Sequence, residues 1–253
     1  MKRLCTALLL AAVCVGAAAA DLPDLAGTWA MVQVYPQIAI LPVAGEVLRS
    51  SSVAQFVEME QDDSMLTMFD SYCFTDVKDG TPLVRTEIPE SFMASLAPQP
   101  RFALLVDQAP GLRFEATTYV EVRGAILDDP ASDPLPTDPA DPRVIDQDGD
   151  GHPGMTVRVA ILSIIQGETY VVQRVSYRLS GTVIGPDRIE GTIEWSDEQT
   201  VLGATNPLLE TNTVGLLDPD PQAHRFVMVR VDPSWDCETL RERLPEILGE
   251  ADP

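Results

Sequence analysis

About ten segments of this chain alternate between apolar and polar residues, and this pattern constrains the fold more than any other feature of the sequence. Successive side chains of a strand point to opposite faces, so alternation is typical of strands with one buried face. Glycine, proline and aspartate separate the segments. We therefore predict an all-β fold, an antiparallel barrel or a sandwich, with one or two short helices. The predicted strands are residues 28–35, 53–59, 65–69, 101–106, 112–126, 155–165, 169–180, 182–184, 189–195 and 225–231.

Two helices and two tight turns complete the expected secondary structure. Residues 88–96 place three apolar side chains four positions apart, on one helical face. Residues 232–243 carry acidic residues early and arginines late, an order that suits the helix dipole. Gln166-Gly167-Glu168 and Gly185-Pro186-Asp187 predict hairpin turns, because each lies between two segments rich in β-branched residues.

The first twenty residues have the pattern of a secretory signal peptide. Lys2 and Arg3 precede an apolar run, and small residues end it at Ala18 and Ala20. We therefore expect residues 1–20 to be removed and residues 21–253 to form a single β-rich domain, exported to the periplasm or secreted. No later stretch reaches the roughly 20 apolar residues of a membrane-spanning helix, so we expect no transmembrane segment in the mature chain.

Cys14 offers an alternative, a lipoprotein attached to the membrane through this cysteine. A lipobox needs a small residue directly before the cysteine, but the bulky Val13 stands there. We therefore favour simple cleavage.

The mature chain retains two cysteines, Cys73 and Cys237. In an oxidising compartment a single pair usually forms a disulfide, which predicts a Cys73–Cys237 bond. Two free buried thiols are the alternative.

The chain is strongly acidic, with a net charge of −22. Such a charge repels the phosphates of nucleic acids and anionic membrane surfaces. We therefore expect no nucleic-acid partner, whereas cations are favoured.

An acidic, proline-rich excursion at residues 128–154 interrupts the strand pattern and ends in alternating aspartates. Asp146, Asp148 and Asp150 precede Gly151, which permits a sharp turn. Over about nine residues this run resembles the D-x-D-x-D-G core of EF-hand, dockerin and thrombospondin type 3 repeat loops. The resemblance implies a structural calcium ion held by the three aspartates and by the backbone carbonyl of His152.

The run also departs from the EF-hand pattern. Its twelfth position is Val157, where an EF-hand has a bidentate glutamate, and a predicted strand follows instead of a helix. Another carboxylate, such as Asp141, would have to complete the ligands. A solvated acidic turn without metal is the alternative.

A second motif stands at the predicted start of the mature chain, where Gly27 and Trp29 open the first predicted strand. This G-x-W pattern resembles the signature of lipocalins and the wider calycin group. The resemblance implies an up-and-down barrel that holds a small apolar ligand, with the tryptophan closing one end. In a different β fold, Trp29 would be an ordinary core aromatic.

The sequence contains no G-x-S-x-G, H-E-x-x-H or P-loop motif, and we assign no catalytic residues. Glu190 and Glu194 share one strand face, where we expect them to be solvated, and we expect His224 at the surface. These features favour a non-enzymatic binding protein. A protein-interaction module and a secreted enzyme of unrecognised type are the alternatives.

Overall fold

The computed structural model describes residues 22–41, 45–162, 164–210 and 214–249. The predicted signal peptide at residues 1–20 and the alternative lipidation site at Cys14 lie outside these described residues.

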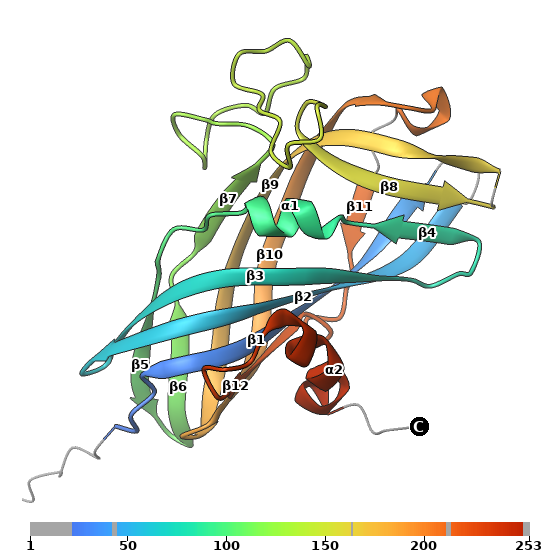
Figure 1. Cartoon of the computed structure of the whole chain (residues 1–253). Helices are drawn as coiled ribbons and strands as arrows, with labels where there is room; N and C mark the ends of the chain where they lie inside the picture. The colour runs from blue at the N-terminus through green and yellow to red at the C-terminus, as the bar shows by residue number, and fades with distance from the viewer. Residues whose placement is uncertain (1–21, 42–44, 163, 211–213, 250–253) are drawn as a thin grey trace, which may run out of the picture.

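The described chain forms one twelve-stranded antiparallel sheet with two short α-helices (Figure 1). The strands are β1 (Gly27–Leu41), β2 (Gly45–Asp62), β3 (Met65–Asp79), β4 (Val84–Glu87), β5 (Arg101–Gln108), β6 (Gly111–Ala116), β7 (Tyr119–Arg123), β8 (Met155–Ile161), β9 (Ile165–Gly185), β10 (Arg188–Ala204), β11 (Val214–Leu217) and β12 (Arg225–Arg230). The two α-helices are α1 (Glu90–Ser95) and α2 (Cys237–Leu248). A 3-10 turn, η1 (Pro207–Leu209), follows β10. This architecture confirms the predicted all-β class.

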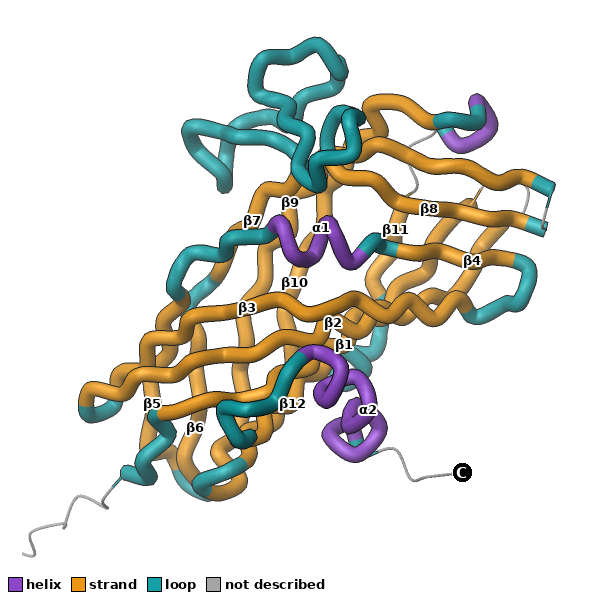
Figure 2. The backbone as a smooth tube through the Cα atoms, in the orientation of Figure 1, coloured by secondary structure: helices purple, strands orange, loops and turns teal. Residues whose placement is uncertain are grey.

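Eight of the strands close into a ring in the order β10, β12, β1, β2, β3, β5, β6 and β9. The ring is not a regular barrel, because one edge of the long strand β9 pairs in turn with β6, β7 and β8. β3 pairs with β5 only over Met65–Met68, so the two sides separate beyond that point. There α1 lies between β3 and β8 (Figure 2), and its Phe92 and Met93 pack against Met155 and Val171.

Apolar side chains fill one half of the ring, which we call the packed end. Trp29 is fully buried there, and its indole nitrogen donates a hydrogen bond to the carbonyl of Leu25 at 2.9 Å. The guanidinium of Arg230, on β12, lies 4.8 Å from the centre of the Trp29 ring. Gly27 has a φ of +125°, and a Cβ added there would lie 3.0 Å from Arg230. A side chain at position 27 would therefore be strained and would crowd the arginine.

Arg230 also connects three separate segments at the packed end. It donates a hydrogen bond to the carbonyl of Asp24 at 2.7 Å and another to the carbonyl of Ala26. It also forms an ion pair of 3.0 Å with Asp187, in the turn between β9 and β10. We call this set of contacts the Trp29–Arg230 clamp. It joins the start of β1, the last strand and the β9–β10 turn.

α2 covers the outer face of the ring over β1, β2 and β12. Its first residue, Cys237, forms the predicted disulfide with Cys73 on β3, with 5.3 Å between the Cα atoms. Asp236 caps the helix by accepting a hydrogen bond from the Thr239 amide at 2.8 Å. The helix therefore begins later than predicted: Asp236 is its N-cap, and residues 232–235 are not helical.

Other secondary-structure predictions also need correction. The predicted turn at residues 166–168 is wrong, because these residues lie inside β9 and Ile161 already pairs with Ile165. The predicted strand 112–126 is two strands, β6 and β7, which pair with different parts of β9. β4 and β11 have only four residues each, too few for alternation to predict them.

We predict that Arg230→Gln lowers the free energy of unfolding by about 1–3 kcal/mol, because a cation–π contact and hydrogen bonds from a charged group each contribute on the order of 1 kcal/mol. Urea unfolding followed by circular dichroism measures the loss. Arg178→Gln is the matched control, since Arg178 forms an exposed ion pair with Glu194 on the outer face. Its expected loss is under about 0.5 kcal/mol. Equal losses in the two variants would contradict the role of the clamp.

Candidate functional site

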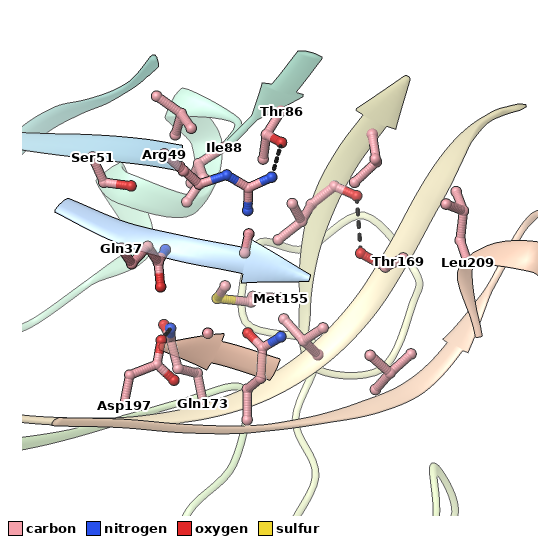
Figure 3. Close-up of a pocket in the computed structure, with 18 of the residues that line it drawn as sticks. Gln37, Arg49, Ser51, Thr86, Ile88, Met155, Thr169, Gln173, Asp197 and Leu209 are labelled. Carbon is pink, nitrogen blue, oxygen red and sulfur yellow. Dashed lines mark hydrogen bonds between the residues drawn. The ribbon is translucent and has the colours of Figure 1, made fainter. Parts of the chain in front are cut away.

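The half of the ring opposite the packed end contains a cavity of about 450 Å³ that is partly open to solvent. β1, β2, β8, β9 and β10 contribute most of its walls (Figure 3). Apolar side chains cover much of the wall, among them Ile88, Met155, Val157, Val159, Val171 and Leu209. Ligand pockets of proteins commonly have 300–1,000 Å³ and this kind of lining. The size and the lining both suit a small molecule with an apolar part.

A smaller space of about 90 Å³ continues the cavity toward the packed end. Gln37, Gln173, Trp195 and Asp197 line both spaces, which therefore meet at these residues. Three tyrosines from three strands line the smaller space: Tyr35, Tyr72 and Tyr177. The cavity thus combines apolar walls with a polar floor.

A chain of polar contacts crosses this floor. The Tyr72 hydroxyl donates a hydrogen bond to Glu121 at 2.7 Å, and Glu121 pairs with Arg123 at 2.8 Å. Arg123 donates to the Gln173 side-chain oxygen at 3.2 Å, and the Gln173 amide nitrogen donates to Asp197 at 3.0 Å. These contacts hold the side chains of β7, β9 and β10 in fixed positions at the bottom of the cavity.

Burial keeps the tyrosine hydroxyls of the floor neutral. It raises the pKa of Tyr35 and Tyr72 well above the usual value, and that of Tyr177 as well. Tyr35 donates a hydrogen bond to the side-chain oxygen of Gln33. The Tyr177 hydroxyl is buried near Gln33 but has no hydrogen bond of good geometry within the described part of the chain.

Asp197 is the carboxylate that reaches the cavity itself. Asp197 lines the cavity and is exposed to solvent, although nearby protein atoms partly desolvate its carboxylate. This desolvation raises the pKa of Asp197, while the hydrogen bond from Gln173 and the charge of Arg123 act in the opposite direction. Figure 3 shows Asp197, Gln173 and Gln37 on the same side of the view.

The cations around the cavity each face a carboxylate. At the wall, Arg49 pairs with Asp79 at 2.8 Å and donates to the Thr86 hydroxyl at 2.7 Å (Figure 3). Beneath the floor, Arg101 and Asp70 form a fully buried pair, with a contact of 2.7 Å. Arg123 is neutralised by Glu121 in the same way. The lining therefore offers no unpaired positive charge among the described residues.

His224 is buried, contrary to the expected surface position. Its Nδ1 accepts a hydrogen bond from the Trp195 indole at 2.8 Å, so its Nε2 carries the proton and donates to the carbonyl of Asp218 at 2.8 Å. Both ring nitrogens are thus engaged, and the Nδ1 contact helps to position Trp195, which lines the cavity. Glu190 and Glu194 lie on the outer face as expected, where they pair with Arg188 and Arg178.

The acidic loop lies at the edge of the ring, directly before β8. Asp146, Asp148 and Asp150 bring one oxygen each within 4.8 Å of one another. Asp146 accepts hydrogen bonds from the amides of Asp150 at 3.1 Å and Gly151 at 2.9 Å, which curls the loop around its carboxylate. Gly151 has a φ of +90°, a conformation that glycine adopts without strain. An Asp triad in this arrangement can hold a metal ion.

Two other residues named from the sequence have different surroundings. The imidazole of His152 stacks on Tyr170, with 4.2 Å between the ring centres, and is therefore turned to β9. Asp141 forms an ion pair of 2.7 Å with Arg143, which lowers its pKa to about 2. Val157, at the twelfth position of the loop, lines the cavity.

The sequence pattern alone does not predict the cavity floor. Gln33 and Tyr35 on β1, and Asp197 on β10, stand at strand positions that polar, solvent-facing residues commonly occupy. These side chains face inward only because the strands close into a ring.

Comparison with protein-family models, with curated proteins and with solved structures found no match. Within the described residues, no helix is long and apolar enough to cross a membrane.

Proposed function

We propose that this protein is an exported binding protein that holds a small, partly apolar ligand in the cavity of its strand ring. The observation that carries the proposal is a cavity of about 450 Å³ with apolar walls and an ordered polar floor. Apolar walls supply affinity, whereas a few fixed polar groups orient a ligand. This is the use that the lipocalin and calycin group makes of a barrel, and the Gly27–Trp29 motif supports the likeness.

The disulfide supports export. A Cys73–Cys237 bond persists in oxidising compartments such as the periplasm or the extracellular space. The signal-peptide pattern of residues 1–20 points in the same direction.

We further propose that calcium is the ion of the acidic loop. Calcium binds oxygens at 2.3–2.6 Å, so two oxygens on opposite sides of one ion are about 5 Å apart, close to the 4.8 Å span of the triad. One carboxylate oxygen of Asp148 is buried without a hydrogen-bond donor among the described residues. Its partner oxygen accepts a bond from the Thr156 amide at 3.1 Å. Calcium would therefore stabilise the entry into β8.

A second candidate function is association with a protein partner. The outer face of β3 and β5 exposes five neighbouring apolar side chains: Met65, Phe69, Phe102, Leu104 and Val106. A cluster of this kind on a sheet surface is a common mark of a protein contact. A second copy of the chain is the partner that can be tested directly.

The binding function is tested with Nile red, a neutral probe whose emission rises in apolar surroundings. We predict that the wild-type protein binds it and that Val157→Trp weakens binding by about tenfold or more, because the added bulk fills the cavity. Arg158→Trp is the matched control: it adds the same bulk at the neighbouring residue, whose exposed side chain faces Glu87 and Glu168. Equal effects of the two variants, or no binding by the wild type, would refute the proposal.

The calcium proposal is tested by thermal unfolding. Loops of extracellular modules bind calcium with dissociation constants of about 10⁻⁴–10⁻³ M, so 10 mM calcium is expected to raise the melting temperature by about 3–10 °C. Asp148→Asn with Asp150→Asn should abolish this rise, whereas Asp129→Asn with Asp133→Asn, in the same acidic excursion, should retain it. The absence of a rise in the wild type after removal of bound metal by chelation would contradict a calcium site.

Self-association is tested by sedimentation velocity between about 5 and 200 μM, a range that covers weak dimers. If the β3–β5 face is a dimer contact, Phe102→Ser shifts the chain toward monomer. Ile126→Ser, at an apolar residue that is 67% exposed elsewhere, leaves the dimer intact. A wild-type monomer throughout this range rules out self-association through the face.

A further inference from the structure

We infer that the ligand of the cavity is an organic cation, an amine whose ammonium group binds Asp197 and whose apolar part lies along the walls. This inference rests on the proposed binding function and specifies the chemical class of the ligand. It follows from the charges that line the cavity and from the position of Asp197.

The charge balance of the cavity leaves one negative charge. Arg49, Arg101 and Arg123 are each compensated by a carboxylate, from Asp79, Asp70 and Glu121. Asp197 forms no ion pair with any described residue, and its hydrogen-bond partner is the neutral side chain of Gln173. A ligand with a carboxylate or phosphate would therefore meet an uncompensated negative charge and no free cation. An ammonium group would complete the balance.

The surroundings of Asp197 give this charge additional weight. The residue keeps contact with solvent in the open cavity, yet the protein atoms around it partly desolvate the carboxylate and raise its pKa. An ion pair at a partly desolvated site is less screened than one on an open surface, so a bound cation would stabilise the charged form of Asp197.

The position of Asp197 suits an amphipathic amine. It lies where the larger space meets the smaller space, so an ammonium group beside it leaves room for an apolar chain on the side of Val157 and Val171. Trp195 precedes it by two residues on the same face of β10 and contacts Tyr35 edge to face, with 5.1 Å between ring centres. Aromatic rings attract cations through their faces.

The hydrogen-bond inventory also matches. An ammonium group has three donors and no acceptor, and a carboxylate only accepts. The net charge of −22 favours the approach of cations to the whole molecule.

The test compares octylamine, octan-1-ol and octanoate, which share one alkyl chain and differ in the head group. Octylamine is protonated at pH 7.5, as expected for an alkylammonium group. Isothermal calorimetry measures each ligand directly, and displacement of Nile red shows whether it occupies the same space. Asp197→Asn removes the charge and keeps the shape. Glu198→Gln removes the charge of the next residue, which pairs with Arg174 and is 58% exposed.

We expect octylamine to bind the wild type about tenfold more tightly than octan-1-ol, and octanoate to bind most weakly. Asp197→Asn should abolish the preference for the amine while leaving the affinity for octan-1-ol unchanged, and Glu198→Gln should change neither. Equal affinities for the amine and the alcohol in the wild type would overturn the inference, as would an amine preference that survives Asp197→Asn.

The two proposals fail in different ways. If Nile red and octan-1-ol bind but the amine has no advantage, the binding function stands and the amine inference is refuted. If neither neutral molecule binds, the apolar-ligand function is refuted. Calorimetric binding of octylamine that depends on Asp197 would then still support recognition of the cation.

Discussion

The pairing of β1 with β12, from Trp29 opposite Arg230 to Val34 opposite Arg225, is the interaction on which the rest of the structure depends, because it joins the first and last strands of the ring. The Arg230 guanidinium reinforces this pairing through its contact with the Trp29 ring, and it reaches the β9–β10 turn through Asp187. A ring of strands has no free edge only if its first and last members stay together. Gly27 allows this close contact because it has no side chain and adopts a positive φ. The clamp therefore explains both residues of the motif that opens β1.

Apolar side chains fill only one end of the ring, so another element has to close the opposite end. The strands separate beyond the short β3–β5 pairing, and α1 fills the opening with Phe92 and Met93. The interior between these two regions is too wide for the side chains to fill, and it forms the cavity. Buried polar groups at its floor are tolerated because they bind one another, from Tyr72 through Glu121 to Asp197.

The sequence predicted the strand content, the disulfide and α1, because these depend on local alternation, cysteine number and helical spacing. It could not predict the cavity floor. In β1, Val32 and Gln33 are both buried, since α2 covers the outer face and the ring encloses the inner one. Alternation then no longer distinguishes the inside of the ring from the outside. The prediction of a turn at residues 166–168 is wrong because it considered only local residue types. Gly167 suits a turn, but it pairs with Val159 of β8 and lies inside β9.

The two acidic features differ in the cations that they can select. Calcium requires six to eight oxygens, and the loop supplies three carboxylates at a suitable spacing, with solvent access for further ligands. Asp197 is a single carboxylate beside the neutral side chain of Gln173, at one end of a cavity that also has apolar walls, which suits a cation that carries its own apolar part. The features are nevertheless connected through β8, because Asp148 and Asp150 both bind Thr156, and the next residue, Val157, lines the cavity. The acidic loop and the cavity wall are therefore adjacent along one strand.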